Sequence, residues 1–110
     1  LQYRTYPPSH YLRDNLKELA LTIAQIGLSY ESGSTYHQKA VNSILYAFCT
    51  SRWFDTTNTT IEILLKCNDL SPEHLEQIAR AVKKNSQIQG AFGLPRFKTF
   101  LHSTYKISID

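Results

Sequence analysis

The chain has 110 residues, of which 42% are hydrophobic and 19% are charged, and its net charge is +3. This length and composition predict one globular domain that builds its own core without disulfide or metal staples. The mildly basic charge does not by itself favour a nucleic-acid partner, and the chain lacks the run of about 18 apolar residues that a membrane span needs.

The first predicted helix covers residues 9–26. Residues 1–8 are expected to be an extended lead-in, because their Pro-Pro pair excludes a helix, and Ser9 is a suitable N-cap. Apolar residues at alternating spacings of four and three predict one core-facing stripe, namely Leu12, Leu16, Leu19, Ile23 and Ile26. We expect Gly27 to end this helix.

The second predicted helix covers residues 34–53, begins at the cap residue Ser34 and is the central helix of the bundle. Its apolar face is broader than a surface helix needs, and we expect it to bury Tyr36, Ala40, Val41, Ile44, Leu45, Ala47, Phe48, Trp53 and Phe54. The stretch DTTNTT, residues 55–60, is rich in side chains that bond to the local backbone. We therefore expect a turn there, followed by a short third helix over residues 59–67.

The sequence LSPE predicts the start of the fourth helix, over residues 72–85. Ser71 is a preferred N-cap, Pro72 suits the first helical position, and Glu73 complements the helix dipole. Residues 85–93, NSQIQGAFG, are expected to form a loop. Residues 61–84 also have the outline of a helix-turn-helix, although the carboxylates at the start of its second helix would repel DNA phosphates.

The fifth predicted helix covers residues 95–106, where aromatic and basic residues alternate along the sequence. A turn of 100° per residue places the apolar side chains on one core-facing arc, namely Leu94, Phe97, Phe100, Leu101 and Tyr105. The basic residues Lys98, His102 and Lys106 form a stripe beside that arc. We therefore interpret the rings as core, rather than as a stacking platform for nucleic-acid bases. Residues 107–110 are expected to be a tail.

The sequence contains no pattern typical of catalysis, of a metal site or of a cofactor site. Its four histidines are distributed over the predicted helices, and no two have the spacing of four that lets one helix face hold a metal. Cys49 and Cys67 lack a CxxC spacing and lie within apolar helix faces, where burial makes a thiol unreactive. We therefore expect no catalytic residue, no metal and no cofactor.

The two cysteines, a glycosylation sequon and the first residue of the chain give expectations about cellular location and about the parent protein. Two cysteines are too few for a disulfide framework, which favours free thiols and a location in the cytoplasm. The alternative is secretion, because Asn58-Thr59-Thr60 is a glycosylation sequon. The sequence does not decide whether the cysteines are bridged or Asn58 is glycosylated. Since the chain begins at Leu1 and contains no methionine, we expect it to be part of a longer protein.

Taken together, the elements predict an all-α bundle of about five helices within a single helical domain, residues 9–106. We expect it to be a non-catalytic domain that binds another protein. Tyrosine is favoured at protein interfaces, and the tyrosines outside the predicted core stripes are the interface candidates: Tyr3, Tyr6, Tyr11 and Tyr30.

Two alternative functions follow from other parts of the sequence. One is recognition of phosphate on nucleic acid or on anionic lipid headgroups, for which the candidate residues are Arg80, Lys83, Lys84, Arg96, Lys98, His102 and Lys106. The other is DNA binding through the helix-turn-helix outline.

Overall fold

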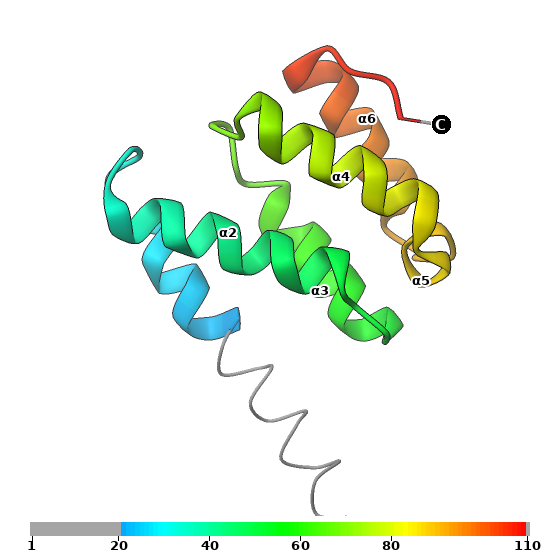
Figure 1. Ribbon diagram of the computed structural model, residues 1–110, viewed down its shortest axis with the longest axis horizontal. Coiled ribbons are helices and arrows are strands. Elements are labelled where there is room, and N and C mark those ends of the chain that lie inside the picture. Colours follow the sequence, from blue (N-terminus) through cyan, green and yellow to red (C-terminus); the bar gives the residue numbers. More distant parts are fainter. Residues whose placement is uncertain (1–20, 110) are drawn as a thin grey trace, which may run out of the picture.

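The computed structural model describes residues 21–109, and within this range the chain is all-α (Figure 1). Residues 21–28 are helical. The helices that follow are α2 Thr35–Cys49, α3 Phe54–Leu64, α4 Pro72–Lys84, α5 Ser86–Gln89 and α6 Leu94–Tyr105. The predicted all-α bundle is therefore confirmed. The lead-in over residues 1–8, the Ser9 cap and the first part of the first predicted helix lie outside the described residues.

Helix α2 begins where the sequence predicts and ends earlier. The Ser34 hydroxyl accepts a hydrogen bond from the backbone N–H of His37 at 3.1 Å, as an N-cap does. The helix ends at Cys49 instead of residue 53. After that end, the Asn85 side chain donates hydrogen bonds to the carbonyls of Cys49 and Ser51, both at 3.2 Å. These bonds hold the connection between α2 and α3 against the end of α4.

Helix α3 includes the DTTNTT stretch, so the turn expected there is wrong. The hydroxyls of Thr57 and Thr59 donate to the carbonyls four residues earlier, at 3.0 and 2.9 Å, and Thr60 donates to the Thr57 carbonyl at 2.7 Å. Threonine hydroxyls can bond to the backbone either in a turn or within a helix. Here burial of Thr57 and Thr60 on the core side selects the helix.

Helix α4 starts at Pro72 as predicted, and its cap is reciprocal. The Ser71 hydroxyl accepts from the His74 N–H, and His74 Nδ1 accepts from the Ser71 N–H, each at 3.2 Å. Asn85 follows the last turn, and its side-chain oxygen accepts from the N–H of Gln87 at 2.8 Å. This second cap begins α5, so the loop expected over residues 85–93 contains a short helix.

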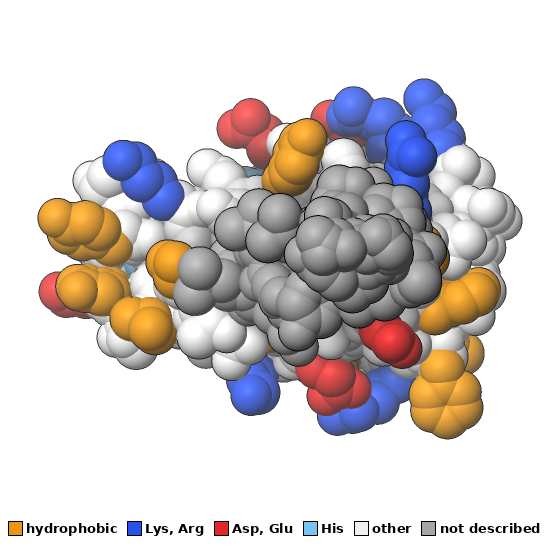
Figure 2. All heavy atoms as spheres, turned by 90° about the horizontal axis from the view of Figure 1, so that it is seen from below, with side chains coloured by type: hydrophobic (Ala, Val, Ile, Leu, Met, Phe, Trp, Pro, Cys, Tyr) orange, Lys and Arg blue, Asp and Glu red, His pale blue; other side chains and the backbone are white. Residues whose placement is uncertain are grey.

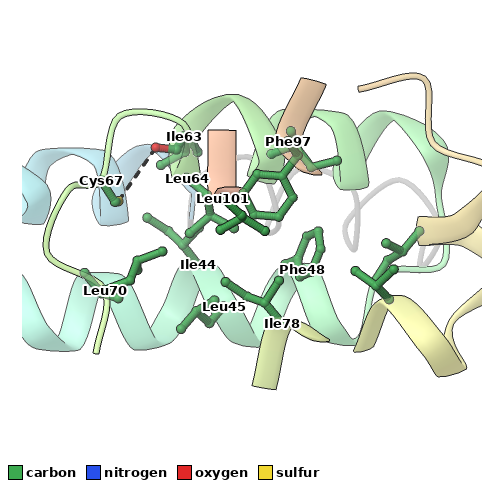
Figure 3. Packing of buried hydrophobic residues seen from close by; sticks show 14 of the residues in the cluster. Ile44, Leu45, Phe48, Ile63, Leu64, Cys67, Leu70, Ile78, Phe97 and Leu101 are labelled. Atoms are coloured by element: carbon green, nitrogen blue, oxygen red, sulfur yellow. Dashed lines mark hydrogen bonds between the residues drawn. The ribbon is translucent and has the colours of Figure 1, made fainter. Parts of the chain in front are cut away.

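The core lies where α2 packs on α3 and α4, with α6 against α3 (Figure 3). Phe48 of α2 meets Phe97 of α6 edge to face, with ring centroids 5.6 Å apart. The hydrophobic side chains with no exposed surface are Ile44, Phe48, Ile61, Leu64, Ile78, Ile88, Phe97 and Leu101. Most of the arc predicted for the last helix is thus core, while Phe100 and Tyr105 are only partly buried.

The C-terminal segment after α6 also joins the core. Tyr105 Oη donates to the Cys67 carbonyl at 2.7 Å and accepts from the Leu70 N–H at 3.2 Å, which ties the end of α6 to the α3–α4 connection. Ile109 is buried, so the predicted tail contributes to packing as far as residue 109. None of the helices described over residues 21–109 is long and apolar enough to cross a membrane.

Candidate functional site

The helical segment over residues 21–28 faces the core with the side opposite to the one predicted. Leu21 and Ala24 are buried, at 8% and 5% exposed, whereas Ile23 and Ile26 are 59% and 58% exposed. The expected burial of these two isoleucines is therefore wrong. Two apolar stripes run along this segment, and only one of them can face the body of the protein.

Small side chains explain which stripe is buried. A β-carbon built on Gly27 would lie 2.7 Å from the β-carbon of Ala40, so the segment approaches α2 as closely as a glycine allows. Ala24 is the other small residue on this side. Close approach between helices favours the side with small residues, which leaves the bulkier Ile23 and Ile26 facing outward. Gly27 therefore acts as a packing residue, and the helix continues through residue 28 instead of ending there.

Two exposed tyrosines follow the exposed isoleucines in the chain: Tyr30 in the turn after this segment and Tyr36 in α2. Hydrogen bonds from the N–H groups of Ser29 and Tyr30 to carbonyls three residues earlier reverse the chain, at 3.0 and 3.1 Å. The Tyr30 ring then packs on Tyr36 of α2, with centroids 5.1 Å apart and planes tilted by 39°. Both rings stay more than half exposed, at 51% and 66%. Ser29 itself is exposed.

These side chains form what we call the apolar face, made of Ile23, Ile26, Tyr30 and Tyr36. Hydrophobic side chains gather at the end of the molecule where α2 begins (Figure 2). Of the sequence-predicted interface residues, Tyr30 belongs to this face, while Tyr3, Tyr6 and Tyr11 lie outside the described residues. Sequence reasoning assigned Tyr36 to the core, which is wrong. The sequence did contain a sign of this exposure. The apolar face predicted for α2 is broader than a surface helix needs, so part of it remains for solvent.

A second group of exposed aromatic side chains lies past the other end of α2. Trp53 is 44% exposed, Phe54 51% and Phe92 93%, so the predicted burial of Trp53 and of Phe54 is wrong. Because α2 ends at Cys49, Trp53 becomes the cap residue of α3 and leaves the inner face of α2. Phe54 lies against Gly90, where an added β-carbon would be 3.2 Å from its ring.

A polar cluster joins the loop before α2 to the loop before α4, and within it only His37 is buried. Asp69 Oδ2 accepts from the Ser32 hydroxyl at 2.6 Å and lies 2.7 Å from His37 Nε2. Burial raises the pKa of Asp69, but the Ser32 hydrogen bond and the neighbouring His37 outweigh it and lower that pKa below its ordinary value. Since Ser32 donates to the carboxylate and not to the imidazole, the cluster lacks the serine–histidine contact of a nucleophilic site.

The cysteine thiols and groups of metal-binding side chains are the other features that could carry chemistry. Cys49 and Cys67 are free. Burial, together with the Asp69 charge, raises the pKa of Cys67 to about 11, which disfavours the reactive thiolate. Between residues 21 and 109, no group of three His, Cys, Asp or Glu side chains could hold a metal ion. Asn58 of the sequon lies within α3, and its side-chain oxygen accepts from the Gly93 N–H at 3.0 Å.

The sequence-predicted phosphate-binding residues divide between α4 and α6. On α6, Arg96 forms an ion pair with Glu62 of α3 at 3.0 Å, and Lys98 is half-buried. At the end of α6, Lys106 Nζ donates to the Ser103 carbonyl at 3.2 Å. His102 is exposed. On α4, Arg80 and Lys84 line a groove beside α2, to which no described residue of α6 contributes. Lys83 is exposed next to them.

No protein-family model, curated protein or solved structure matches this chain. The function is therefore inferred from the chemistry of its surfaces. The apolar face combines exposed large aliphatic side chains of residues 21–28 with the exposed Tyr30–Tyr36 ring pair.

Proposed function

We propose that this protein is a non-catalytic interaction domain and that the apolar face binds another protein. The observation that carries the proposal is the outward orientation of Ile23 and Ile26 on the segment that leads into the exposed Tyr30–Tyr36 ring pair. The two free thiols support an intracellular location, where cysteines stay reduced.

The energetics of the apolar face favour a protein partner. Soluble proteins rarely leave large apolar side chains exposed as a contiguous group, and such groups mark interaction sites. Covering them stabilises a complex by about 25 cal/mol for each Å² of apolar surface removed from water. The ring pair also suits an interface, because two packed tyrosines have little side-chain freedom left to lose, and each brings a hydroxyl.

The two alternative functions have less support. Three of the four basic residues on α6 and at its end are engaged or half-buried, which weakens a phosphate-binding stripe there. The connection between α3 and α4 spans residues 65–71, whereas a helix-turn-helix uses a turn of about three or four residues. A positively charged surface does exist elsewhere, where Arg52, Arg80 and Lys84 line a groove between α2 and α4.

Site-specific photo-cross-linking tests the proposal. A benzophenone amino acid replaces Tyr36 in one protein and Phe92 in another, because both side chains are well exposed and lie in different aromatic groups. Each protein is irradiated in extract from its source cells. We expect the Tyr36 position to capture one discrete partner that the Phe92 position does not capture.

Affinity measurements with the purified partner then decide the site. Ile26→Asp places a charge on the apolar face, and we expect it to weaken binding at least about tenfold, the effect of losing a central interface residue. Phe92→Asp is the matched control and should retain binding within about threefold. Equal losses in both variants, or capture only from position 92, would move the interface away from the apolar face.

A further inference from the structure

A second surface feature is an open groove between α2 and α4, with a volume of about 1200 Å³. It is lined by the C-terminal half of α2, the α2–α3 connection, α4 and the start of α5. Leu45 lies at the base of the groove and is 2% exposed, whereas Ala81 is half-buried and the Tyr46 side chain is 72% exposed, so these two supply its apolar surface. None of the groove residues belongs to the apolar face, so the two surfaces are independent.

The groove is positively charged on both sides. Arg52 comes from the α2–α3 connection, while Arg80 and Lys84 come from one face of α4, four residues apart. None of the described residues that line the groove is acidic. Arg80 pairs with Glu76 at 2.8 Å, whereas Arg52 and Lys84 form no ion pair with any residue between 21 and 109. Two cations are thus available for an anionic ligand.

The side of the groove that carries Arg52 is held in place before any ligand binds. The Asn85 amide bonds the carbonyls of Cys49 and Ser51, the residues just before Arg52. The Ser51 hydroxyl is in turn bonded to Thr57 and to the Trp53 carbonyl. This network joins the ends of α2, α3 and α4. A fixed backbone at the charged positions lowers the ordering cost of binding.

We propose that this groove binds an acidic segment of a protein partner, with its carboxylates held between Arg52 and the Arg80–Lys84 pair. The groove is larger than a single carboxylate or phosphate requires, and its apolar surface suits the aliphatic stems of a peptide. A nucleic acid fits less well, because the two described cations without an ion pair are fewer than the row of phosphate contacts that holds a nucleic-acid chain. Charge complementarity with an acidic peptide therefore identifies the ligand class.

A direct binding measurement tests this inference. The probe is a fluorescein-labelled peptide of six glutamates and one tyrosine, followed by fluorescence anisotropy at low and at physiological salt. We expect saturable binding that weakens with salt, and amide shifts in nuclear magnetic resonance spectra at residues 50–52 and 80–86. Arg52→Gln and Lys84→Gln should each weaken binding at least about threefold, the size expected for one partly exposed ionic contact.

Lys66→Gln is the matched control, because it removes the same charge from an exposed lysine outside the groove. It should leave the affinity unchanged, and circular dichroism should show that all three variants fold. Absence of saturable binding, or an equal loss in Lys66→Gln, would overturn the groove as the site. Tighter binding of a single-stranded oligonucleotide, lost in Lys84→Gln, would overturn the peptide as its ligand. Neither result depends on the apolar face.

Discussion

Replacing Gly27 with alanine should destabilise this protein, although the same change inside a helix usually stabilises. Alanine is favoured over glycine in a helix by up to about 1 kcal/mol. At this position, however, the new β-carbon would lie 2.7 Å from the β-carbon of Ala40 and 3.4 Å from the Tyr36 carbonyl oxygen. Neither β-carbon can rotate away, so the two helical backbones must separate.

The magnitude follows from these opposing effects. Overpacking costs about 1–3 kcal/mol, and the helix preference offsets part of that cost. A net loss of about 1–2 kcal/mol in the free energy of unfolding is expected, which is a measurable part of the 5–15 kcal/mol typical of a domain. With a urea m-value of about 2 kcal/mol/M, the midpoint should fall by about 0.5–1 M.

A double-mutant cycle identifies the contact itself. Ala40→Gly alone should cost about 1 kcal/mol through helix preference, but it removes the atom that the new methyl group would strike. The double variant Gly27→Ala, Ala40→Gly should therefore be more stable than the sum of the single effects by about 1 kcal/mol or more. A raised midpoint for Gly27→Ala, or simple additivity in the cycle, would refute the close packing that turns Ile23 and Ile26 outward.

Three further predictions concern the core, the polar cluster and the aromatic group at the start of α3. Phe97→Ala should lower the free energy of unfolding by about 3–5 kcal/mol in urea titrations, because the ring is fully buried. Phe100→Ala should lower it clearly less, because the Phe100 ring is only partly buried. Equal losses in the two variants would contradict this difference. The lowered pKa of Asp69 means that its contribution to stability is present above the unfolded-state pKa of about 3.9 and is lost as the pH falls through the lower folded-state pKa. Asp69→Asn should therefore flatten the fall of the urea midpoint below about pH 4, and an unchanged acid profile would contradict the role of the Ser32 and His37 contacts. Trp53 should emit at long wavelength and be quenched by iodide, since it is 44% exposed; a blue-shifted, protected emission would show that it is buried.

The helical class could be predicted from the sequence, as could the features that depend on neighbouring residues. The starts at Ser34 and Ser71 follow from caps that act within one turn, and both are present in the structure. The burial of Phe97 and Leu101 follows from the helical period within a single element. Such features depend only on local geometry, so they can be predicted from the sequence.

Where the sequence was compatible with several arrangements, contacts between distant residues selected the one that forms. Threonine hydroxyls suit either a turn or a helix, and burial against the core made residues 55–60 helical. Trp53 became exposed because the Asn85 amide, 32 positions later in the chain, holds the connection at the end of α2. The apolar face depends on the fit between Gly27 and Ala40, which lie on different helical segments. Periodicity identifies the apolar stripes of a helix, but which stripe is buried is decided by the shape of the surface it meets.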